Sequence, residues 1–435
     1  MTHDFQTLVV GSGPAGIAAA VCAAEHGLRV GLVDDNPNPG GQIWRGKAET
    51  GNIADISHIE DAGKWRKRLF AASITRLQGW SVFDHPSANT LRAERRGEAA
   101  DFRYETLILA TGARERFLPF PGWTLPNVMG AGAIQAMMKS GLPMRGKRVV
   151  IAGSGPLLLA VASALKATGA IVMCICEQAS ISGLLPFALT LMATPGKIIE
   201  GLHHRASTWN IPFYTSSWPV DAGGDGQLRS VTLSIHGKIK TIACDYLACG
   251  FHLVPNVELP LLLGCKLANG SVVVNEWQQT SVPGIFCAGE PTGVGGLELS
   301  LIEGQIAGLT AAGRQDKART HFTQWRKYSR FAERLARAFA LRHELRLLPN
   351  DSTLLCRCED VPYGAVRQHS DWRTAKLHTR CGMGPCQGRI CGSATEFLLG
   401  WNMYSVRPPI FPALISSLAS SRTEGEPNLN CKPEL

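Results

Sequence analysis

Long apolar runs are missing from this 435-residue sequence, and no stretch is long enough and free enough of charge to span a bilayer. The first residues also lack the basic and apolar regions of a secretory signal, because a buried strand is expected almost at once, at Thr7–Val10. No low-complexity block interrupts the chain, and charged residues make up only 18% of it. We therefore expect a globular protein in the cytoplasm or peripherally at the inner face of the membrane.

The pair Cys-x-x-Cys is absent too, although the chain contains 13 cysteines. Without an export signal, most of them should be thiols or metal ligands rather than disulfides. Seven fall in the first two thirds of the chain, mostly in apolar strands, where we interpret them as small buried hydrophobes: Cys22, Cys174, Cys176, Cys244, Cys249, Cys265 and Cys287. The absence of a pair with the spacing Cys-x-x-Cys argues against a disulfide reductase.

Basic residues outnumber acidic ones, 44 to 35, but they form no long cluster. The short groups at Arg92–Arg96 and Lys64–Arg68 fit a solvated surface, and the second has helical spacing. This distribution excludes a nucleic-acid partner and leaves a surface suited to anionic cofactors or an acidic protein.

An imperfect internal repeat organises the chain. The segment Thr7–Gly16 is restated at Arg148–Leu157, about 140 residues later, and each copy is an apolar run, a glycine-rich turn and an Ala/Leu-rich stretch. A run without polar alternation indicates a parallel strand buried on both faces, and the turn begins the crossover of a βαβ unit. Two such units predict an α/β protein with two doubly wound dinucleotide-binding domains.

Three further strand ends divide the chain: Thr106–Gly112, Tyr246–Gly250 and Gly284–Glu290. They indicate that the first fold is interrupted by the second and completed after it. We predict a discontinuous FAD-type domain at residues 1–115 and 251–315 and a second, NAD-like nucleotide domain at 116–250. A helical connector should follow at 316–350, then a small cysteine-rich module at 351–400 and an extended tail at 401–435.

The first glycine turn has the context of a dinucleotide site. Gly11 permits the tight turn, Gly13 lets the backbone approach a pyrophosphate, and Gly16 allows helix and strand to pack closely. The phosphates then meet the N-terminus of the helix. Asp34 ends the next strand, where an acidic group binds a ribose hydroxyl. A simple tight turn between core elements is the weaker alternative.

Several segments of the first fold resemble the FAD site of the glutathione and thioredoxin reductase superfamily. Ala110-Thr-Gly112 matches its second glycine motif, Gly284–Glu290 matches the strand whose acid holds the ribityl chain, and Gly40-Gly-Gln42 matches the loop near the flavin. Glu290 replaces the usual Asp. The resemblance implies FAD, or another adenine nucleotide, bound by Gly11, Gly13, Pro14, Ala15, Gly16, Asp34, Gly41, Gln42, Thr111, Gly112, Gly289 and Glu290.

The second glycine turn is altered. Gly153 and Gly155 are present, but Leu158 stands at the third glycine position and should hold the helix away from the strand. Glu177 ends the following strand and could still bind a ribose. We expect ordinary NAD binding to be lost, so that electrons leave by another route; a retained scaffold or a different nucleotide is the alternative.

Cysteines gather near the C-terminal end. Cys356, Cys358, Cys381 and Cys386 can close a sulfur cage around metal, and the glycines between the last two expose backbone N–H groups that can hydrogen-bond cluster sulfides. A structural zinc site is the alternative. Attachment to a flavin domain favours a 2Fe–2S cluster. Cys391 is interpreted as a packing residue or a substitute ligand.

The cysteine segments 356–359 and 379–391 resemble the bacterioferritin-associated ferredoxin module in larger subunits of heteromeric amine and amino-acid dehydrogenases. With Gly11–Gly16, Pro39–Trp44 and Gly153–Leu158, the resemblance covers nearly the whole chain. The chain is thus similar to the α subunits of flavin-dependent opine oxidases, which are related to proline and hydroxyproline dehydrogenases and hydrogen cyanide synthase. The gap between Cys358 and Cys381 is shorter than expected for the family, so 360–378 is predicted to be a trimmed helical hairpin.

This resemblance implies a division of labour. The substrate C–N bond is oxidised at FAD in a separate, smaller β subunit, and electrons pass, with FMN at the subunit interface, to the cluster and an external quinone or dye; a further small subunit can be present. An opine would yield an amino acid and a 2-oxo acid. The chain itself shows no catalytic acid–base pair, and His203-His204 is interpreted as a solvated helix end. A free-standing NAD(P)H-dependent ferredoxin-type reductase and a zinc-stabilised scaffold are the alternatives.

Overall fold

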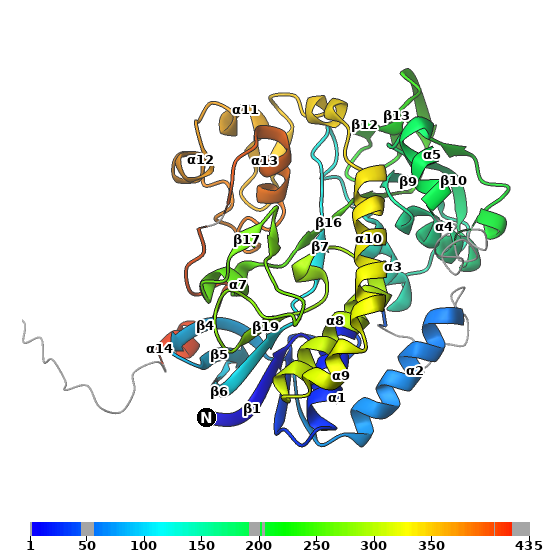
Figure 1. Ribbon diagram of the computed structural model, residues 1–435. Helices are drawn as coiled ribbons and strands as arrows, with labels where there is room; N and C mark the ends of the chain where they lie inside the picture. The colour runs from blue at the N-terminus through cyan, green and yellow to red at the C-terminus, as the bar shows by residue number, and fades with distance from the viewer. Residues whose placement is uncertain (1, 45–55, 191–200, 202–204, 404, 420–435) are drawn as a thin grey trace, which may run out of the picture.

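The computed structural model describes residues 2–44, 56–190, 201, 205–403 and 405–419 (Figure 1). In these residues the N-terminal strand lies inside a seven-stranded sheet of order β3-β2-β1-β6-β5-β4, with β19 added beside β6. The strands β1, β2, β3, β6 and β19 pair in parallel, whereas β4, β5 and β6 pair antiparallel. Their bounds are β1 Thr2–Val10, β2 Val30–Asp34, β3 Ile74–Gln78, β4 Ser81–Ser87, β5 Thr90–Arg95, β6 Glu98–Leu109 and β19 Ile285–Cys287.

Helices from distant parts of the sequence cover this sheet. They are α1 (Pro14–Ala24), α2 (Ile56–Ala71), α8 (Gly296–Ala311) and α9 (Gln315–Arg319). The helices α1 and α8 touch through small residues. A Cβ atom added at Gly304 would lie 2.2 Å from the carbonyl oxygen of Ala15, and one at Gly308 would lie 2.3 Å from that of Ala19. Only glycine permits so close an approach of α8 to α1. The contact between the two helices holds the end of β19 beside the first glycine turn.

The second sheet is parallel, with the order β11-β10-β9-β15-β8. Leu158, Val161 and Leu165 of its helix α4 pack against this sheet and are buried. An antiparallel sheet of β12, β13 and β14 packs beside it. The bounds are β8 Val128–Gly130, α3 Ala131–Lys139, β9 Arg148–Ser154, α4 Leu157–Ala167, β10 Ile171–Glu177, α5 Ile181–Thr190, β11 Phe213–Tyr214, β12 Ser217–Gly223, β13 Ser230–Ile235, β14 Lys238–Ala243 and β15 Tyr246–Phe251.

The chain enters and leaves the second fold through one antiparallel pair, β7 (Ala113–Glu115) and β16 (Leu253–Pro255). After β16 the chain returns to the first fold. The elements of this return are α7 Glu258–Leu262, β17 Leu267–Ala268, β18 Ser271–Val272, β19 and the short 3-10 helix η2 Glu290–Thr292. The first fold is therefore completed by residues that follow the second.

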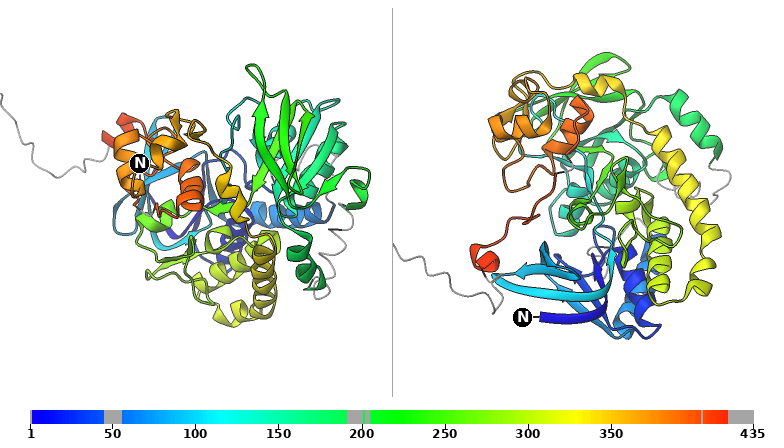
Figure 2. Two further views of the ribbon diagram at one scale, coloured as in Figure 1. Left: turned by 90° about the horizontal axis from the view of Figure 1, so that it is seen from above. Right: turned by 60° about the vertical axis from the view of Figure 1, so that its left-hand side comes forward.

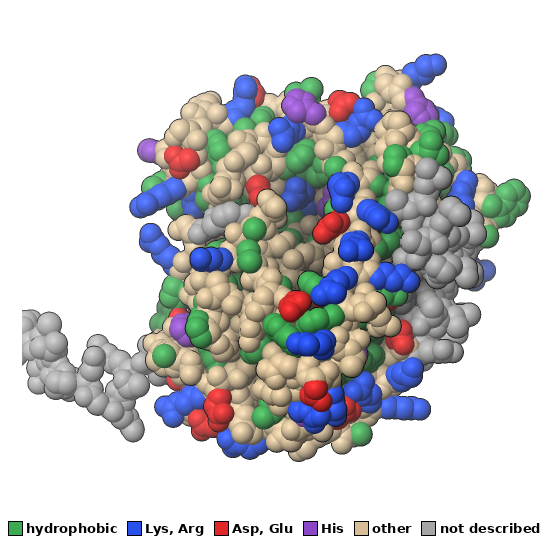
Figure 3. Space-filling model, in the orientation of Figure 1, with side chains coloured by type: hydrophobic (Ala, Val, Ile, Leu, Met, Phe, Trp, Pro, Cys, Tyr) green, Lys and Arg blue, Asp and Glu red, His purple; other side chains and the backbone are tan. Residues whose placement is uncertain are grey.

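Helix α10 (Phe322–Ala338) runs along the outside of the molecule from the first fold to the second (Figures 1 and 2). One face carries exposed Lys and Arg side chains, which form a blue band on the face shown in Figure 3. At its C-terminal end, the rings of Phe331 and Phe339 pack against Phe187 of α5. The 3-10 helix η3 (His343–Leu347) then leads toward the cysteines.

The cysteine-rich segment has its own small core, which includes Leu355, Val366 and Trp372. The predicted helical hairpin is present as two short helices, α11 and α12. The tail lies along the edge of the first sheet, where the Ile410 N–H donates to the Phe83 carbonyl at 2.8 Å. It is not wholly extended, because it contains α14. The bounds are β20 Leu354–Cys356, β21 Val361–Pro362, α11 Tyr363–Val366, α12 Trp372–Thr379, α13 Cys391–Leu399 and α14 Ile415–Ala419.

None of the helices in the described ranges combines the length and the apolar character that crossing a membrane requires.

Candidate functional site

The three glycines of the first turn differ in their surroundings. A Cβ atom at Gly11 would lie 2.1 Å from the Ala110 carbonyl oxygen, and one at Gly16 would lie 1.7 Å from that of Gly11. At Gly13 no described atom lies within 4 Å of the same position. The outer two glycines therefore serve close packing, and the middle one leaves open space in front of the α1 N-terminus. This is the arrangement that a pyrophosphate needs.

Residues predicted to surround the nucleotide lie around this turn. Pro14 is the first residue of α1, and Ala15 lies under α8. A Cβ atom at Gly41 would lie 2.9 Å from Gly13 Cα, so the loop before Trp44 folds against the glycine turn, and Gln42 is exposed there. The Asp34 carboxylate, at the end of β2, accepts hydrogen bonds from the Ser12 and Asn36 N–H groups.

The turn after β6 is held by Asn256. Thr111 donates its hydroxyl to the Asn256 carbonyl at 2.7 Å, and the Asn256 side-chain amide donates to the Thr111 carbonyl at 2.8 Å. The Asn256 N–H donates to the Gly112 carbonyl at 3.0 Å. Because Asn256 follows β16, these bonds fix the Thr111-Gly112 turn at the point where the chain returns from the second fold.

The loop after β19 depends on a buried carboxylate that sequence reasoning missed. Glu303 of α8 accepts hydrogen bonds from the Gly289 N–H at 2.8 Å, the Thr292 hydroxyl at 2.9 Å and the Trp325 indole at 3.3 Å. Burial raises its pKa to about 7. The pKa of Glu290 is raised to about 7 for the same reason. An acidic residue directly after Leu301 and Ile302, within a mostly buried helix, was the available signal for Glu303.

These segments meet where β1, β6 and β19 end beside one another in a parallel sheet. Open space at Gly13, the N-terminus of α1 and the neighbouring Glu290 fit a dinucleotide that extends from the glycine turn toward the loop after β19. The residues present therefore fit a flavin nucleotide, which would supply two-electron redox chemistry when bound.

The second glycine turn keeps part of this geometry. A Cβ atom at Gly153 would lie 2.0 Å from the Gly250 carbonyl oxygen, and the space beyond Gly155 is open. Glu177 is 2% exposed and accepts hydrogen bonds from the Gly155 N–H at 2.7 Å and the Ala179 N–H at 2.8 Å. Burial raises its pKa to about 7. Leu158 is buried in the adjoining core beside Gly250, whose missing side chain leaves it room.

The connector covers this second turn. The Ser154 hydroxyl donates to the Phe339 carbonyl at 2.9 Å, and the Gln178 amide donates to the same carbonyl at 3.1 Å and to that of Ala340 at 3.2 Å. His252, which follows β15, bonds to the Phe339 carbonyl at 2.6 Å. The backbone carbonyl groups that follow α10 thus accept hydrogen bonds from the polar side chains at the ends of β9 and β10.

Three cysteines form a buried group in the C-terminal module. The sulfur atoms of Cys356, Cys381 and Cys391 lie within 4.8 Å of one another. Hydrogen bonds, first from Cys381 and then from Cys391, lower the pKa of Cys356 to about 2. The Gly382 N–H also donates to the Cys356 sulfur at 3.5 Å. Cys391, the first residue of α13, is therefore beside the predicted ligands Cys356 and Cys381.

The other two predicted ligands lie at the edge of this group. Cys358 is exposed and Cys386 is half-buried. A Cβ atom at Gly384 would lie 2.4 Å from Cys358 Cβ, so the loop between Cys381 and Cys386 closes over Cys358. A 2Fe–2S cluster requires thiolates and backbone N–H groups. The three buried cysteines, together with either Cys358 or Cys386, would hold it. The same donors suit zinc.

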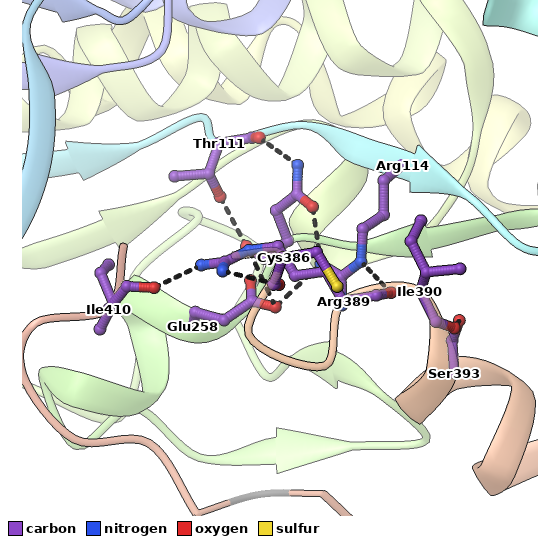
Figure 4. A network of polar contacts seen from close by, with 9 residues as sticks. Thr111, Arg114, Glu258, Cys386, Arg389, Ile390, Ser393 and Ile410 are labelled. Atoms are coloured by element: carbon purple, nitrogen blue, oxygen red, sulfur yellow. Dashed lines mark hydrogen bonds and ion pairs between the residues drawn. The ribbon is translucent and has the colours of Figure 1, made fainter. Parts of the chain in front are cut away.

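Arg114 and Arg389 link the flavin side to the cysteine loop (Figure 4). Arg114 contacts Asn256 Oδ1 at 2.8 Å and Glu258 Oε1 at 2.9 Å. Arg389 lies 3.8 Å from the same Glu258 oxygen and donates to the Cys386 carbonyl at 3.3 Å and the Ile410 carbonyl at 2.7 Å. The pair His203-His204 lies outside the described residues.

A family model described as pyridine nucleotide-disulphide oxidoreductase matches residues 5–315. The chain belongs to this family. Hydrogen cyanide synthase subunit HcnB of Pseudomonas aeruginosa is 30% identical, over 97% of this chain and 100% of its own length. An opine oxidase subunit of Rhizobium meliloti is also 30% identical, over 95% of this chain and 98% of its own length. Within the pyridine nucleotide-disulphide oxidoreductases, the chain therefore belongs with these two relatives.

Solved structures agree with this fold. L-proline dehydrogenase from P. horikoshii superposes with a TM-score of 0.68 at 20% identity, covering 96% of this chain and 80% of that one. Thioredoxin reductase from T. acidophilum gives a TM-score of 0.52 at 21% identity, covering 75% and 98%. The predicted fold class and family are confirmed, and the chain is an oxidoreductase of the pyridine nucleotide-disulphide family.

Proposed function

We propose that the chain is the electron-transferring α subunit of a heteromeric flavin-dependent opine oxidase. In this proposal a smaller flavin-containing β subunit oxidises the C–N bond of an opine such as nopaline or octopine, with FMN at the interface between the two. A further small subunit can join them. The chain binds FAD in its first fold and a 2Fe–2S cluster at its cysteines, and passes electrons to a quinone or a dye in the cytoplasm or at the inner face of the membrane.

The observation that carries this proposal is the continuous polar connection between the Thr111-Gly112 turn and the Cys386 loop. It runs through Asn256, Arg114 and Glu258 to Arg389. A nucleotide at the glycine turns and a centre at the cysteines would then be held in a fixed relative position. Fixed separation is what electron transfer between two centres needs, and the connector over Ser154 and Gln178 favours it over exchange with NADH.

Within this arrangement the chain's own residues bind and orient. The open space at Gly13 admits phosphates, and Glu290 and Glu303 shape the loop near a flavin. The trio Cys356, Cys381 and Cys391 would hold iron, which supplies one-electron chemistry when bound. In this proposal the oxidation of the C–N bond takes place on the partner.

The test is co-expression with the product of a neighbouring gene, followed by purification, cofactor extraction and a dye-reduction screen with opines, proline, hydroxyproline and glycine. We expect FAD and iron to remain with this chain and opine-dependent dye reduction to require both proteins. Rapid, stoichiometric bleaching of the flavin by NADH in the isolated chain would instead establish a free-standing ferredoxin-type reductase. Zinc without iron or flavin would establish a scaffold.

A second candidate rests on the relatives. HcnB and the opine oxidase relative match this chain equally well, at 30% identity, and L-proline dehydrogenase shares its fold. The α subunit of a hydrogen cyanide synthase or of a proline or hydroxyproline dehydrogenase would use the same sites. Cyanide formation from glycine or preferential oxidation of proline in the screen would identify it.

A further inference from the structure

A cavity of about 330 Å³ lies between the cysteine module and the first fold. Its walls come from β7, α12, α13, the loop between Cys381 and Cys391, the segment around α7, and the tail before α14. Its volume is within the range of small-molecule sites. The functions proposed above assign it no ligand.

The cavity is lined by more positive than negative groups. Five cations face two carboxylates, and one of these carboxylates, Glu258, is already shared by Arg114 and Arg389. Nearby cations outside the cavity have partners, as in the pairs of Arg367 with Asp351 and Arg380 with Glu359. Across the described chain, by contrast, no carboxylate pairs with the remaining three cations of the lining: Arg373, Lys376 and Arg407. Such a site attracts an anion.

The apolar part of the lining reaches the cysteines. Trp372 is a wall residue, and its ring packs so tightly on the cysteine loop that a Cβ atom at Gly382 would lie 2.6 Å from it. Met403, another wall residue, similarly occupies the space above Gly392. Because Gly382 and Gly392 follow Cys381 and Cys391, one layer of side chains separates the cavity from the cysteine trio.

We propose that this cavity binds a small organic anion with an apolar, planar body, and that this anion, held beside the cysteine trio, is the electron acceptor of the proposed complex. The cations Arg373, Lys376 and Arg407 select the charge, and Trp372, Met383 and Leu261 contact the ring. The proposal rests on the function proposed above. A quinone-type acceptor takes up two electrons, which come from the amine oxidised on the partner protein, and two protons, which come from solvent.

The experiment measures binding without turnover. The purified, oxidised full-length chain is dialysed against the anionic dye 2,6-dichlorophenolindophenol and, in parallel, against the cationic planar dye phenazine methosulfate. We expect one anionic dye to bind per chain and its affinity to fall as salt is added. In the double variant Lys376→Gln/Arg407→Gln the affinity should fall about tenfold or more, because two attractive charges are lost. Binding of the cationic dye should not weaken.

The matched control is Arg330→Gln, which removes an exposed cation from α10, away from the cavity. It should bind the anionic dye like the unaltered chain, and iron and flavin contents should be equal in all three proteins. Equal affinity for both dyes, or a double variant that binds like Arg330→Gln, would overturn the assignment of the cavity. The function proposed above would then stand if the complex still oxidises an amine. Failure of that oxidation with dye binding intact would overturn the function and the acceptor role, and would leave the cavity as an anion-binding site.

Discussion

The Nε–H group of Arg114 donates to the carbonyl oxygen of Arg389 at 3.1 Å, although 275 residues separate the two in the sequence. Arg114 lies two residues after Gly112 of the flavin-side turn, and Arg389 lies three residues after Cys386. Both guanidinium groups also reach Glu258 Oε1. One carboxylate and two arginines thus join the first fold to the cysteine module.

Replacing Glu258 by Gln should loosen this junction. The change leaves Arg114 and Arg389 close together without a shared negative charge, and all three side chains are mostly buried. We expect a loss of about 1–3 kcal/mol in the free energy of unfolding, measured by urea denaturation. Glu333→Gln is the control, since its exposed pair with Arg337 on α10 should contribute less than about 0.5 kcal/mol. Equal losses in both variants would show that the junction does not stabilise the chain.

Gly16→Ala should abolish nucleotide binding. The new methyl group would stand 1.7 Å from the Gly11 carbonyl oxygen, so the α1 N-terminus must move away from β1. We expect the flavin content, measured by extraction and fluorescence, to fall below detection and the stability to fall by about 1–3 kcal/mol. Gly63→Ala in α2 has open space around the new atom and should raise stability by up to about 1 kcal/mol. Normal flavin content in Gly16→Ala would contradict the assignment of the turn.

Cys391→Ser should lose iron as completely as Cys356→Ser and Cys381→Ser, because the three sulfur atoms share one group. The measurement is iron per chain by elemental analysis, together with the visible spectrum. Cys22→Ala, in α1 of the first fold, should retain its iron. Full iron content in Cys391→Ser would return Cys391 to a packing role and favour the pair Cys358 and Cys386 as ligands.

The buried Glu303 predicts a pH dependence. Its folded-state pKa of about 7 lies above the unfolded value, so its contribution to stability is fully present below pH 4.5 and is lost as the pH rises through 7. Glu303→Gln does not ionise but loses hydrogen bonds to Gly289, Thr292 or Trp325. At pH 5 the variant should therefore have a lower free energy of unfolding than the unaltered chain. This difference in the free energy of unfolding should be smaller by about 1–3 kcal/mol at pH 8. A pH-independent difference in urea denaturation would contradict the raised pKa, and exposed Glu98→Gln is the control.

NADH should neither bind tightly nor bleach the flavin rapidly. The carbonyl groups of Phe339 and Ala340 occupy Ser154 and Gln178 beside the second glycine turn. For this reason Leu158→Gly alone should not restore binding, although it restores the usual glycine. The affinity for NADH is measured by fluorescence titration of the unaltered chain and of Leu158→Gly. Tight binding by Leu158→Gly would show that Leu158, rather than the connector, closes the site.

Local sequence signals were sufficient for the fold class. The apolar strands and glycine turns at Gly11 and Gly153 depend on neighbouring residues only, and they predicted two nucleotide folds. The sheet of β12, β13 and β14 was not predicted, although its second turn, His236-Gly237, has the positive φ values of 49° and 80° that suit a two-residue hairpin. That dipeptide was a usable signal.

Long-range contacts set the limit of prediction at the site. Cys391 joins Cys356 and Cys381 only because α13 begins at that residue and turns its side chain inward. The cover over Ser154 comes from Phe339, 185 residues away. Periodicity and spacing report neighbours along the chain. They left Cys391 as a packing residue or a substitute ligand, and they gave no sign of the contact with Phe339.

The packing of α8 on α1 through Gly304 and Gly308 has a consequence for synthesis on the ribosome. The second sheet draws all its strands from residues 128–251, whereas the first lacks β19 and the cover of α8 until about residue 311 has emerged. A nascent chain should therefore fold its second sheet first, because α1 can pack against α8 only after α8 has been synthesised. Flavin insertion would then be a late event that follows release of most of the chain.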